Sequence, residues 1–227
     1  MYLFFDTETT GLPINWKAPV TDLNNWPRLV QIAYLLYDKN RNKISEVNHI
    51  VKPNDFLIPL EASKVHGIST ERATREGKDI RLVLQAFLEI VNNSEYLIAH
   101  NMSFDEKIIV AELIRNNLPN NIETKQKICT MLSSTNFCAI KSNYGYKWPK
   151  LSELHFKLFG TNFEEAHNAA IDIKVTAKCF WKLVDKKIIS LPYISEAIKL
   201  NNQKFSPSNS FNIFEQAYKE ITILKTG

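Results

Sequence analysis

The chain has 227 residues, of which 44% are hydrophobic, and it carries a formal net charge of +4. This composition predicts one substantial hydrophobic core with room for a smaller appendage. The positive charge suits a polyanionic partner, but it is too small to indicate non-specific binding along a DNA backbone. No apolar run approaches the length needed to span a membrane, so we expect no membrane partner.

The cysteines and the first residues bear on the cellular compartment. Cys129, Cys138 and Cys179 are odd in number and form no C-x-x-C pair, so the sequence predicts neither a disulfide framework nor a zinc site. The first predicted strand begins at Tyr2, which leaves no room for a signal peptide. We therefore expect a cytoplasmic protein.

The first predicted strand carries a pair of acids. Residues 2–5 form an apolar run (YLFF), which Asp6 and Glu8 follow before Gly11. Side chains two residues apart on a strand point to the same face, so these carboxylates are expected about 7 Å apart. Like charges held this close need a cation or a proton. The alternative is a pair of solvated acids in a loop, as expected for an arbitrary D-x-E motif.

Residues 11–28 form a long, proline-rich connection that contains Trp16 and Trp26. This segment predicts either a loop that stacks on a base or folds over a cleft, or a small satellite core. Two further strands are then expected on either side of a turn at 39–42. Together with the first strand they form an antiparallel meander.

A third acid follows the next predicted strand, at residues 96–99. The spacing predicts a helix that begins after Ser103, where Ser103 and Glu106 form a capping box and Asp105 lies in the first turn. The alternative role of Asp105 is to stabilise the start of the helix and nothing more.

Residues 140–151 (IKSNYGYKWPKL) interleave lysines with aromatic residues. This pattern suits a single nucleic-acid strand, because the cations can meet phosphates and the rings can stack on bases. An ordinary loop with solvated lysines is an equal alternative.

The last acid of interest, Asp172, lies in the first turns of a long helix expected over 169–184, and His167 just precedes this helix. The sequence then becomes turn-rich and ends in an amphipathic helix over 212–224. We expect this final helix to dock either on the preceding domain or on a partner.

Three sequence blocks occur in the order FFDTETTGL, AHNMSFD and HNAAID, with a weaker fourth, VHGIS, at 65–69. Together they resemble the DnaQ-like 3′-5′ exonucleases of the DEDDh group, which includes polymerase proofreading subunits and RNase T. The resemblance covers an exonuclease domain at 1–187 and leaves a C-terminal extension at 188–227. It implies an α/β, RNase H-like fold with a mixed five-stranded sheet flanked by helices, plus the helical C-terminal extension.

The resemblance also implies the catalytic residues. Asp6, Glu8, Asp105 and Asp172 would hold two Mg²⁺ or Mn²⁺ ions, and two such ions can clamp the attacking and leaving oxygens of a phosphodiester. His167 would be the general base that takes a proton from the attacking water. A tyrosine replaces this histidine in the sister group.

Further residues match the substrate contacts of the family by position. The expected substrate-binding residues are Thr9, Thr10, Leu12, His66, His100 and Phe104. Leu12 would help to separate the last two nucleotides, and His66 would approach the terminal one. For His66, an equal alternative is a structural role at a helix end beside Gly67.

The resemblance therefore implies a metal-dependent exonuclease that acts on the free 3′ end of single-stranded or frayed DNA and releases nucleoside 5′-monophosphates. Proofreading or repair would be its setting, with a DNA polymerase as one implied partner. One alternative is an enzyme that trims the 3′ ends of RNA. An alternative of another class is a catalytically silent module that binds nucleic acid.

Overall fold

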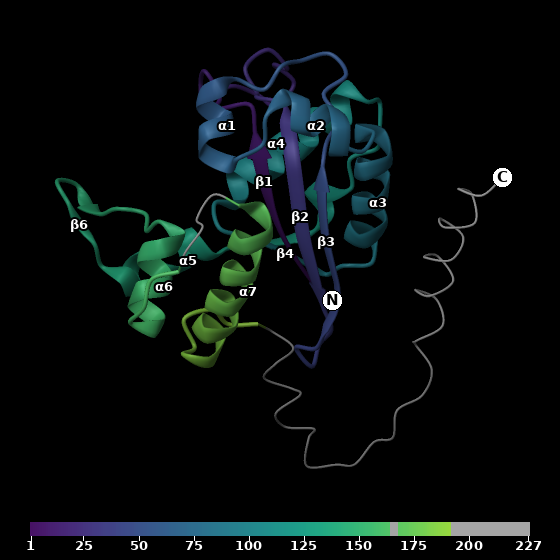
Figure 1. The fold of residues 1–227 in the computed structure, drawn as a ribbon. Helices are drawn as coiled ribbons and strands as arrows, with labels where there is room; N and C mark the ends of the chain where they lie inside the picture. Colours follow the sequence, from purple (N-terminus) through teal and green to yellow (C-terminus); the bar gives the residue numbers. More distant parts are fainter. Residues whose placement is uncertain (164–167, 192–227) are drawn as a thin grey trace, which may run out of the picture. The chain divides into compact units, whose positions relative to one another are not determined.

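The computed structural model describes residues 1–163 and 168–191 (Figure 1). The chain divides into one compact unit over Met1–Ile189 and a second over Ser190–Gly227, of which only the first two residues are described. His167 and the helix expected over 212–224 lie outside the described residues.

A mixed five-stranded sheet forms the centre of the first unit. Its strands are β1 (Tyr2–Thr9), β2 (Leu29–Tyr37), β3 (Lys43–Ile50), β4 (Tyr96–Ala99) and β5 (Gln126–Cys129), in the spatial order β3-β2-β1-β4-β5. β1, β2 and β3 form the expected antiparallel meander, and β4 and β5 run parallel to β1. The predicted α/β architecture with a mixed sheet is confirmed.

One face of the sheet is covered by α3 (Ile80–Asn92) and α4 (Met102–Arg115). Leu3 and Phe5 of β1 point to this face, and Phe5 packs against Phe87 of α3 with ring centroids 5.4 Å apart. Because side chains alternate along a strand, the residues with even numbers on β1 point to the opposite face.

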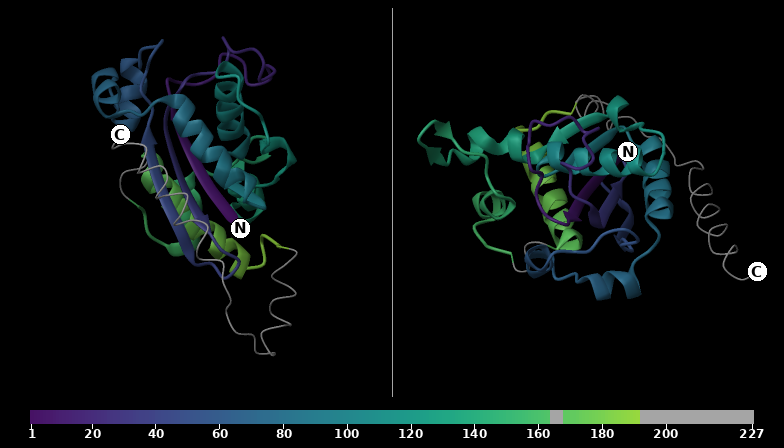
Figure 2. Two further views of the ribbon diagram at one scale, coloured as in Figure 1. Left: turned by 90° about the vertical axis from the view of Figure 1, so that its right-hand side faces the viewer. Right: turned by 90° about the horizontal axis from the view of Figure 1, so that it is seen from above.

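That opposite face is covered by α7 (Ala169–Asp185), so that the strands lie between α7 and α3 (Figure 2). Phe4 meets Phe180 of α7 at 5.1 Å between ring centroids, and Tyr2 meets Trp181 at 5.1 Å. Alternate side chains of β1 therefore pack against the helices on the two faces of the sheet. Packing on both faces fixes the register of the strand.

The remaining elements connect these along the chain. They are α1 (Leu60–His66), α2 (Thr70–Glu76), the 3-10 turn η1 (Ile122–Thr124), α5 (Thr130–Cys138), the two-stranded hairpin β6 (Lys141–Ser142) and β7 (Gly145–Tyr146), and α6 (Leu151–Phe159). Within residues 1–163 and 168–191, no helix is long and apolar enough to cross a membrane.

The predicted capping box of Ser103 and Glu106 is wrong. α4 begins at Met102 with Asn101 as its N-cap, because Asn101 adopts the left-handed conformation (φ 97°) and turns the chain into the helix earlier than expected. The carboxylate of Glu106 is bound by Lys127 instead. Asp105 nevertheless lies in the first turn, as predicted.

The connection at 11–28 packs on the main core and forms no satellite core. The Trp26 side chain is 2% exposed and belongs to the core beneath α4, and its indole N–H donates to the carbonyl of Pro19 at 3.0 Å. Trp16 remains half exposed and contacts Phe104 of α4, with ring centroids 5.7 Å apart. The aromatic residues therefore fasten this loop to α4.

Candidate active site

Three carboxylates meet where β1 approaches its carboxyl end. Asp6 and Glu8 lie on the face of β1 that is covered by α7, and Asp172 lies in the first turn of α7. One carboxylate oxygen from each of the three lies within 4.8 Å of the other two. Residues 166 positions apart in the sequence thus come together at the end of the sheet.

The position of Asp172 follows from how α7 begins. The side chain of Asn168 is the N-cap and accepts a hydrogen bond from the backbone N–H of Ala170 at 3.0 Å. Further along the helix, Ile173 and Phe180, two turns apart, are both buried, which fixes the rotation of the helix. Asn168 was not among the expected site residues, although an Asn directly before a helical apolar pattern is a recognisable cap signal.

Asp105 reaches the site from the other layer. Its carboxylate accepts two hydrogen bonds from Thr7, one from the backbone N–H at 3.0 Å and one from the hydroxyl at 2.7 Å. The Asp105 side chain is almost fully buried. Thr7 was also missed by the sequence analysis, because nothing in its local sequence separates it from an ordinary strand threonine.

Burial, joined in two cases by neighbouring charges, raises the pKa of three of the four carboxylates. Burial raises the pKa of Asp6 well above its usual range, and the charges of Asp105, Glu8 and Asp172 raise it further. Burial, followed by the charges of Asp172 and Asp105, raises the pKa of Glu8 to about 8. Burial raises the pKa of Asp105 to about 7, although the hydrogen bonds from Thr7 oppose this change.

This donor set fits divalent cations of the hard class. Carboxylate oxygens are the protein ligands of Mg²⁺ and Mn²⁺, and a bound cation would favour the charged carboxylates that burial and mutual repulsion disfavour. Asp6, Glu8 and Asp172 are close enough to share one ion, and Asp105 is coupled to them by charge. The arrangement therefore supports the predicted metal site.

The residues after β1 differ in what they can offer a ligand. The hydroxyl of Thr9 is buried and donates to the carbonyl of Gly11 at 2.6 Å. The hydroxyl of Thr10 accepts from the backbone N–H of Arg28 at 2.9 Å. Leu12 leaves 72% of its surface exposed, so its side chain is available for contact.

His66 ends α1, and Gly67 follows in the left-handed conformation, as the structural alternative required. Its Nδ1 accepts a hydrogen bond from the backbone N–H of Ile68 at 3.2 Å, so Nε2 carries the proton. Nε2 is buried. Burial lowers the pKa of His66, and a backbone hydrogen bond with Thr9 opposes this change. His66 is thereby linked to the end of β1.

His100 and Phe104 are less available than the sequence suggested. The ring Nε2 of His100 donates to the carbonyl of Pro149 at 3.0 Å, and Nδ1 is 2.9 Å from the hydroxyl of Thr130. Burial lowers the pKa of His100 to about 4, so the ring is neutral near pH 7. Phe104 is partly buried and packs against Trp16.

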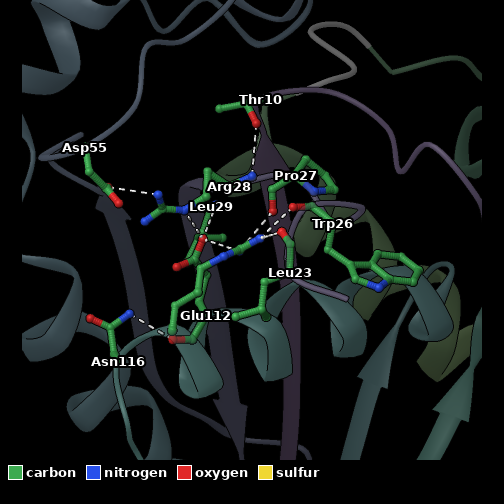
Figure 3. A network of polar contacts seen from close by, with 10 residues as sticks. Thr10, Leu23, Trp26, Pro27, Arg28, Leu29, Asp55, Glu112 and Asn116 are labelled. Carbon is green, nitrogen blue, oxygen red and sulfur yellow. Dashed lines mark hydrogen bonds and ion pairs between the residues drawn. The ribbon is translucent and has the colours of Figure 1, made fainter. Parts of the chain in front are cut away.

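A buried ion network holds the segment that follows β1 (Figure 3). The carboxylate of Glu112 in α4 is fully buried and binds Arg28 Nε at 2.8 Å and Arg115 Nη1 at 2.8 Å. Arg28 also binds the exposed Asp55 at 2.8 Å. Because the backbone of Arg28 bonds to Thr10, this network connects α4 to the expected substrate-binding segment.

Comparison with known proteins matches this chain to a family. The family model described as an exonuclease (RNase T) matches residues 3–180. The DNA polymerase III PolC-type of Streptococcus pneumoniae is 29% identical over 210 residues, which is 92% of this chain but 13% of that protein. The DNA polymerase III subunit epsilon of Treponema pallidum is 26% identical over 180 residues, or 79% of this chain and 74% of that one.

The fold is also that of a solved nuclease. E. coli Exonuclease I in complex with a dA16 oligonucleotide superimposes with a TM-score of 0.62 at 18% identity, over 82% of this chain and 41% of that one. This likeness confirms the predicted RNase H-like arrangement of sheet and helices.

Proposed function

The chain belongs to the RNase T exonuclease family, and from this premise we propose that it removes nucleotides from the free 3′ end of DNA in a reaction that requires divalent cations. The observation that carries the proposal is the cluster of Asp6, Glu8 and Asp172 within 4.8 Å. Carboxylates with raised pKa values gain stability from a cation, and a phosphodiester needs its charge offset before water can attack it.

We infer that Asp6, Glu8, Asp105 and Asp172 hold two Mg²⁺ or Mn²⁺ ions. Bound there, the ions would offset the charge of the phosphate and favour ionisation of the attacking water. Thr7 orients Asp105 through two hydrogen bonds, so the fourth carboxylate is held in place before any ligand binds. His167, which directly precedes the Asn168 cap of α7, is proposed as the base that takes the proton from the water.

End recognition is assigned to the segment that follows β1. Leu12 is exposed and would separate the last base pair, and the buried N–H of His66 faces the region where β1 ends. Thr9 and Thr10 use their hydroxyls within the protein, so we assign them a contribution through the backbone. We assign His100 and Phe104 a supporting role: His100 holds the carbonyl of Pro149, and Phe104 packs against Trp16.

DNA is proposed as the substrate because the similar curated proteins are DNA polymerases or a polymerase subunit. The same similarity supports association with a replicative polymerase. The chain spans 13% of the length of the PolC-type relative, so its role beside a polymerase is part of the proposal. RNA is the alternative substrate, and only its 2′-hydroxyl distinguishes it at the terminal sugar.

The test uses end-labelled substrates in Mg²⁺. A single strand with a 5′ label should shorten in a ladder from its 3′ end, while a 3′-phosphate version and a closed circle should resist. Cutting of the circle at a comparable rate would refute exonucleolytic action. An RNA strand of the same sequence, digested in parallel, distinguishes the two substrates.

A further inference from the structure

The hairpin between α5 and α6 extends away from the body of the first unit (Figures 1 and 2). It comprises residues 139–150, and we call it the basic-aromatic hairpin. Its two short strands, β6 and β7, pair Lys141 with Tyr146 and Ser142 with Gly145. The backbone N–H of Lys147 donates to the carbonyl of Ile140 at 2.9 Å and closes the hairpin at its base.

The hairpin exposes an unusual amount of aromatic surface. The exposed fractions are 99% for Tyr144, 49% for Tyr146 and 64% for Trp148. Exposed aromatic residues that lie close together indicate a binding surface, because burying these rings in the core would have been favourable.

The charge of the hairpin indicates the class of partner. Residues 139–150 contain three lysines, Lys141, Lys147 and Lys150, and no acidic residue. Glu153 of α6 pairs with one of them, at 2.6 Å from Lys147 Nζ. Protein interfaces are depleted in lysine, whereas single-stranded nucleic acid is bound by cations and stacking rings together. The composition therefore favours a polynucleotide over a protein.

The base of the hairpin is tied to the end of the sheet that carries the carboxylates. β4 runs parallel to β1 with Ile98 paired to Phe4, and His100 directly follows the carboxyl end of β4. His100 holds the carbonyl of Pro149 at 3.0 Å, and Pro149 directly follows Trp148. The hairpin is therefore anchored next to its exposed Trp148 by the residue that follows β4.

We propose that the basic-aromatic hairpin binds the single-stranded segment of the polynucleotide that leads into the carboxylate site. This inference rests on the proposed function, because it assigns the strand upstream of the reacting end. Tyr144, Tyr146 and Trp148 stack on successive bases, and Lys141 and Lys150 contact phosphates. Longer single strands are therefore held better than very short ones.

The test compares a long substrate with a minimal one. The full chain with Tyr144→Ala and Trp148→Ala is assayed on a single strand of about 16 nucleotides, the upper site size of one single-strand-binding fold. It is also assayed on the p-nitrophenyl ester of thymidine 5′-monophosphate, which has no upstream strand. KM for the long strand should rise about 10-fold or more, because each stacked base contributes that order of affinity. For the ester, both kcat and KM should stay unchanged.

Two controls isolate the rings and the charges. Leu82→Ala removes an exposed apolar side chain from α3, on the other face of the sheet, and should leave KM unchanged. Lys141→Gln should lower the slope of log KM against log salt by about 0.7, the value for one phosphate contact on a single strand.

An unchanged KM for the long strand would overturn the proposal and leave the hairpin as a surface for a protein partner. An equal loss on both substrates would also overturn it, because the effect would then act through the carboxylate site. If the wild-type chain cleaved neither substrate, the proposed function would fail separately. Fluorescence anisotropy with the labelled strand would then decide on the hairpin, since the variant should bind about 10-fold more weakly.

Discussion

The hydroxyl of Thr7 donates a 2.7 Å hydrogen bond to the carboxylate of Asp105, which lies 98 positions further along the chain. The backbone N–H of Thr7 bonds to the same oxygen at 3.0 Å. Since Thr7 lies between Asp6 and Glu8 on β1 and points to the opposite face, one strand serves both helical layers of the site.

Thr7→Val tests this contact. Valine keeps the shape of the side chain and removes the hydroxyl, and a hydrogen bond to a charged group contributes about 1.5–3 kcal/mol. We expect turnover at limiting Mg²⁺ to fall about 10-fold or more, with a higher Mg²⁺ concentration needed for half-maximal rate. Thr7→Ser keeps the hydroxyl and should restore most of the rate. Equal Mg²⁺ dependence in the valine variant and the wild type would show that the hydroxyl does not position Asp105.

Part of this site could be predicted from the sequence. Asp6 and Glu8 share a face because of strand periodicity, which is local information, and Asp105 and Asp172 lie in first helical turns that the patterns indicated. The contact between Thr7 and Asp105 could not be predicted, because it depends on how β1 and the start of α4 are placed in space. The start of α4 was misjudged for a related reason, since the left-handed Asn101 sets it.

The ion network was also missed, although one signal existed. Glu112 falls among apolar residues of α4 at the spacing of the buried Ile108 and Ile109, where a solvated charge is not expected. Its partner Arg115 is three residues on, but Arg28 comes from a distant loop. A buried acid on an apolar helix face predicts a partner without telling which residue supplies it.

The free energy of unfolding should depend on pH through Glu8. Its pKa in the folded protein is about 8, above the ordinary value of 4.5, so the folded form keeps a proton that the unfolded form has lost. Without metal, the contribution of Glu8 to the free energy of unfolding is therefore greatest below about pH 4.5, and it is lost as the pH rises through about 8. In a chelator, Glu8→Gln should raise the melting temperature by a few degrees at pH 8.5 and change it little at pH 4.5. A constant difference at both pH values would argue against ionisation of Glu8 as the cause.

Divalent cations should stabilise the folded chain as well as enable turnover. A ligand at 100 times its Kd adds about 2.7 kcal/mol, which corresponds to roughly 5–10 °C in melting temperature for a chain of this size. Asp6→Asn should abolish this shift and nearly all turnover, because the ions would lose a ligand. Asp185→Asn, at the other end of α7, serves as the control and should keep both the shift in melting temperature and the turnover. Full activity in Asp6→Asn would remove Asp6 from the site.

Glu112→Gln should be strongly destabilising. The carboxylate is fully buried between two arginines, and neutralising it leaves uncompensated charge, which costs about 3–5 kcal/mol. Asp55 binds the same Arg28 from the exposed side, so Asp55→Asn should cost only about 0–1 kcal/mol. Urea unfolding measures both values. Similar losses of unfolding free energy in the two variants would mean that the burial of Glu112 does not increase the cost of removing its charge.

The role of His167 can be separated from metal binding by kinetics. If His167 takes the proton from the attacking water, His167→Ala should reduce kcat by roughly 10²–10⁴-fold while the Mg²⁺ concentration for half-maximal rate changes little. The acid limb of the pH profile near the histidine pKa should disappear, because the variant has no imidazole to protonate there. His49→Gln, on the edge strand β3, is the matched control and should keep the limb. An unchanged kcat with a higher Mg²⁺ concentration for half-maximal rate would instead make His167 a metal ligand. An unchanged acid limb would assign the role of the base to another group.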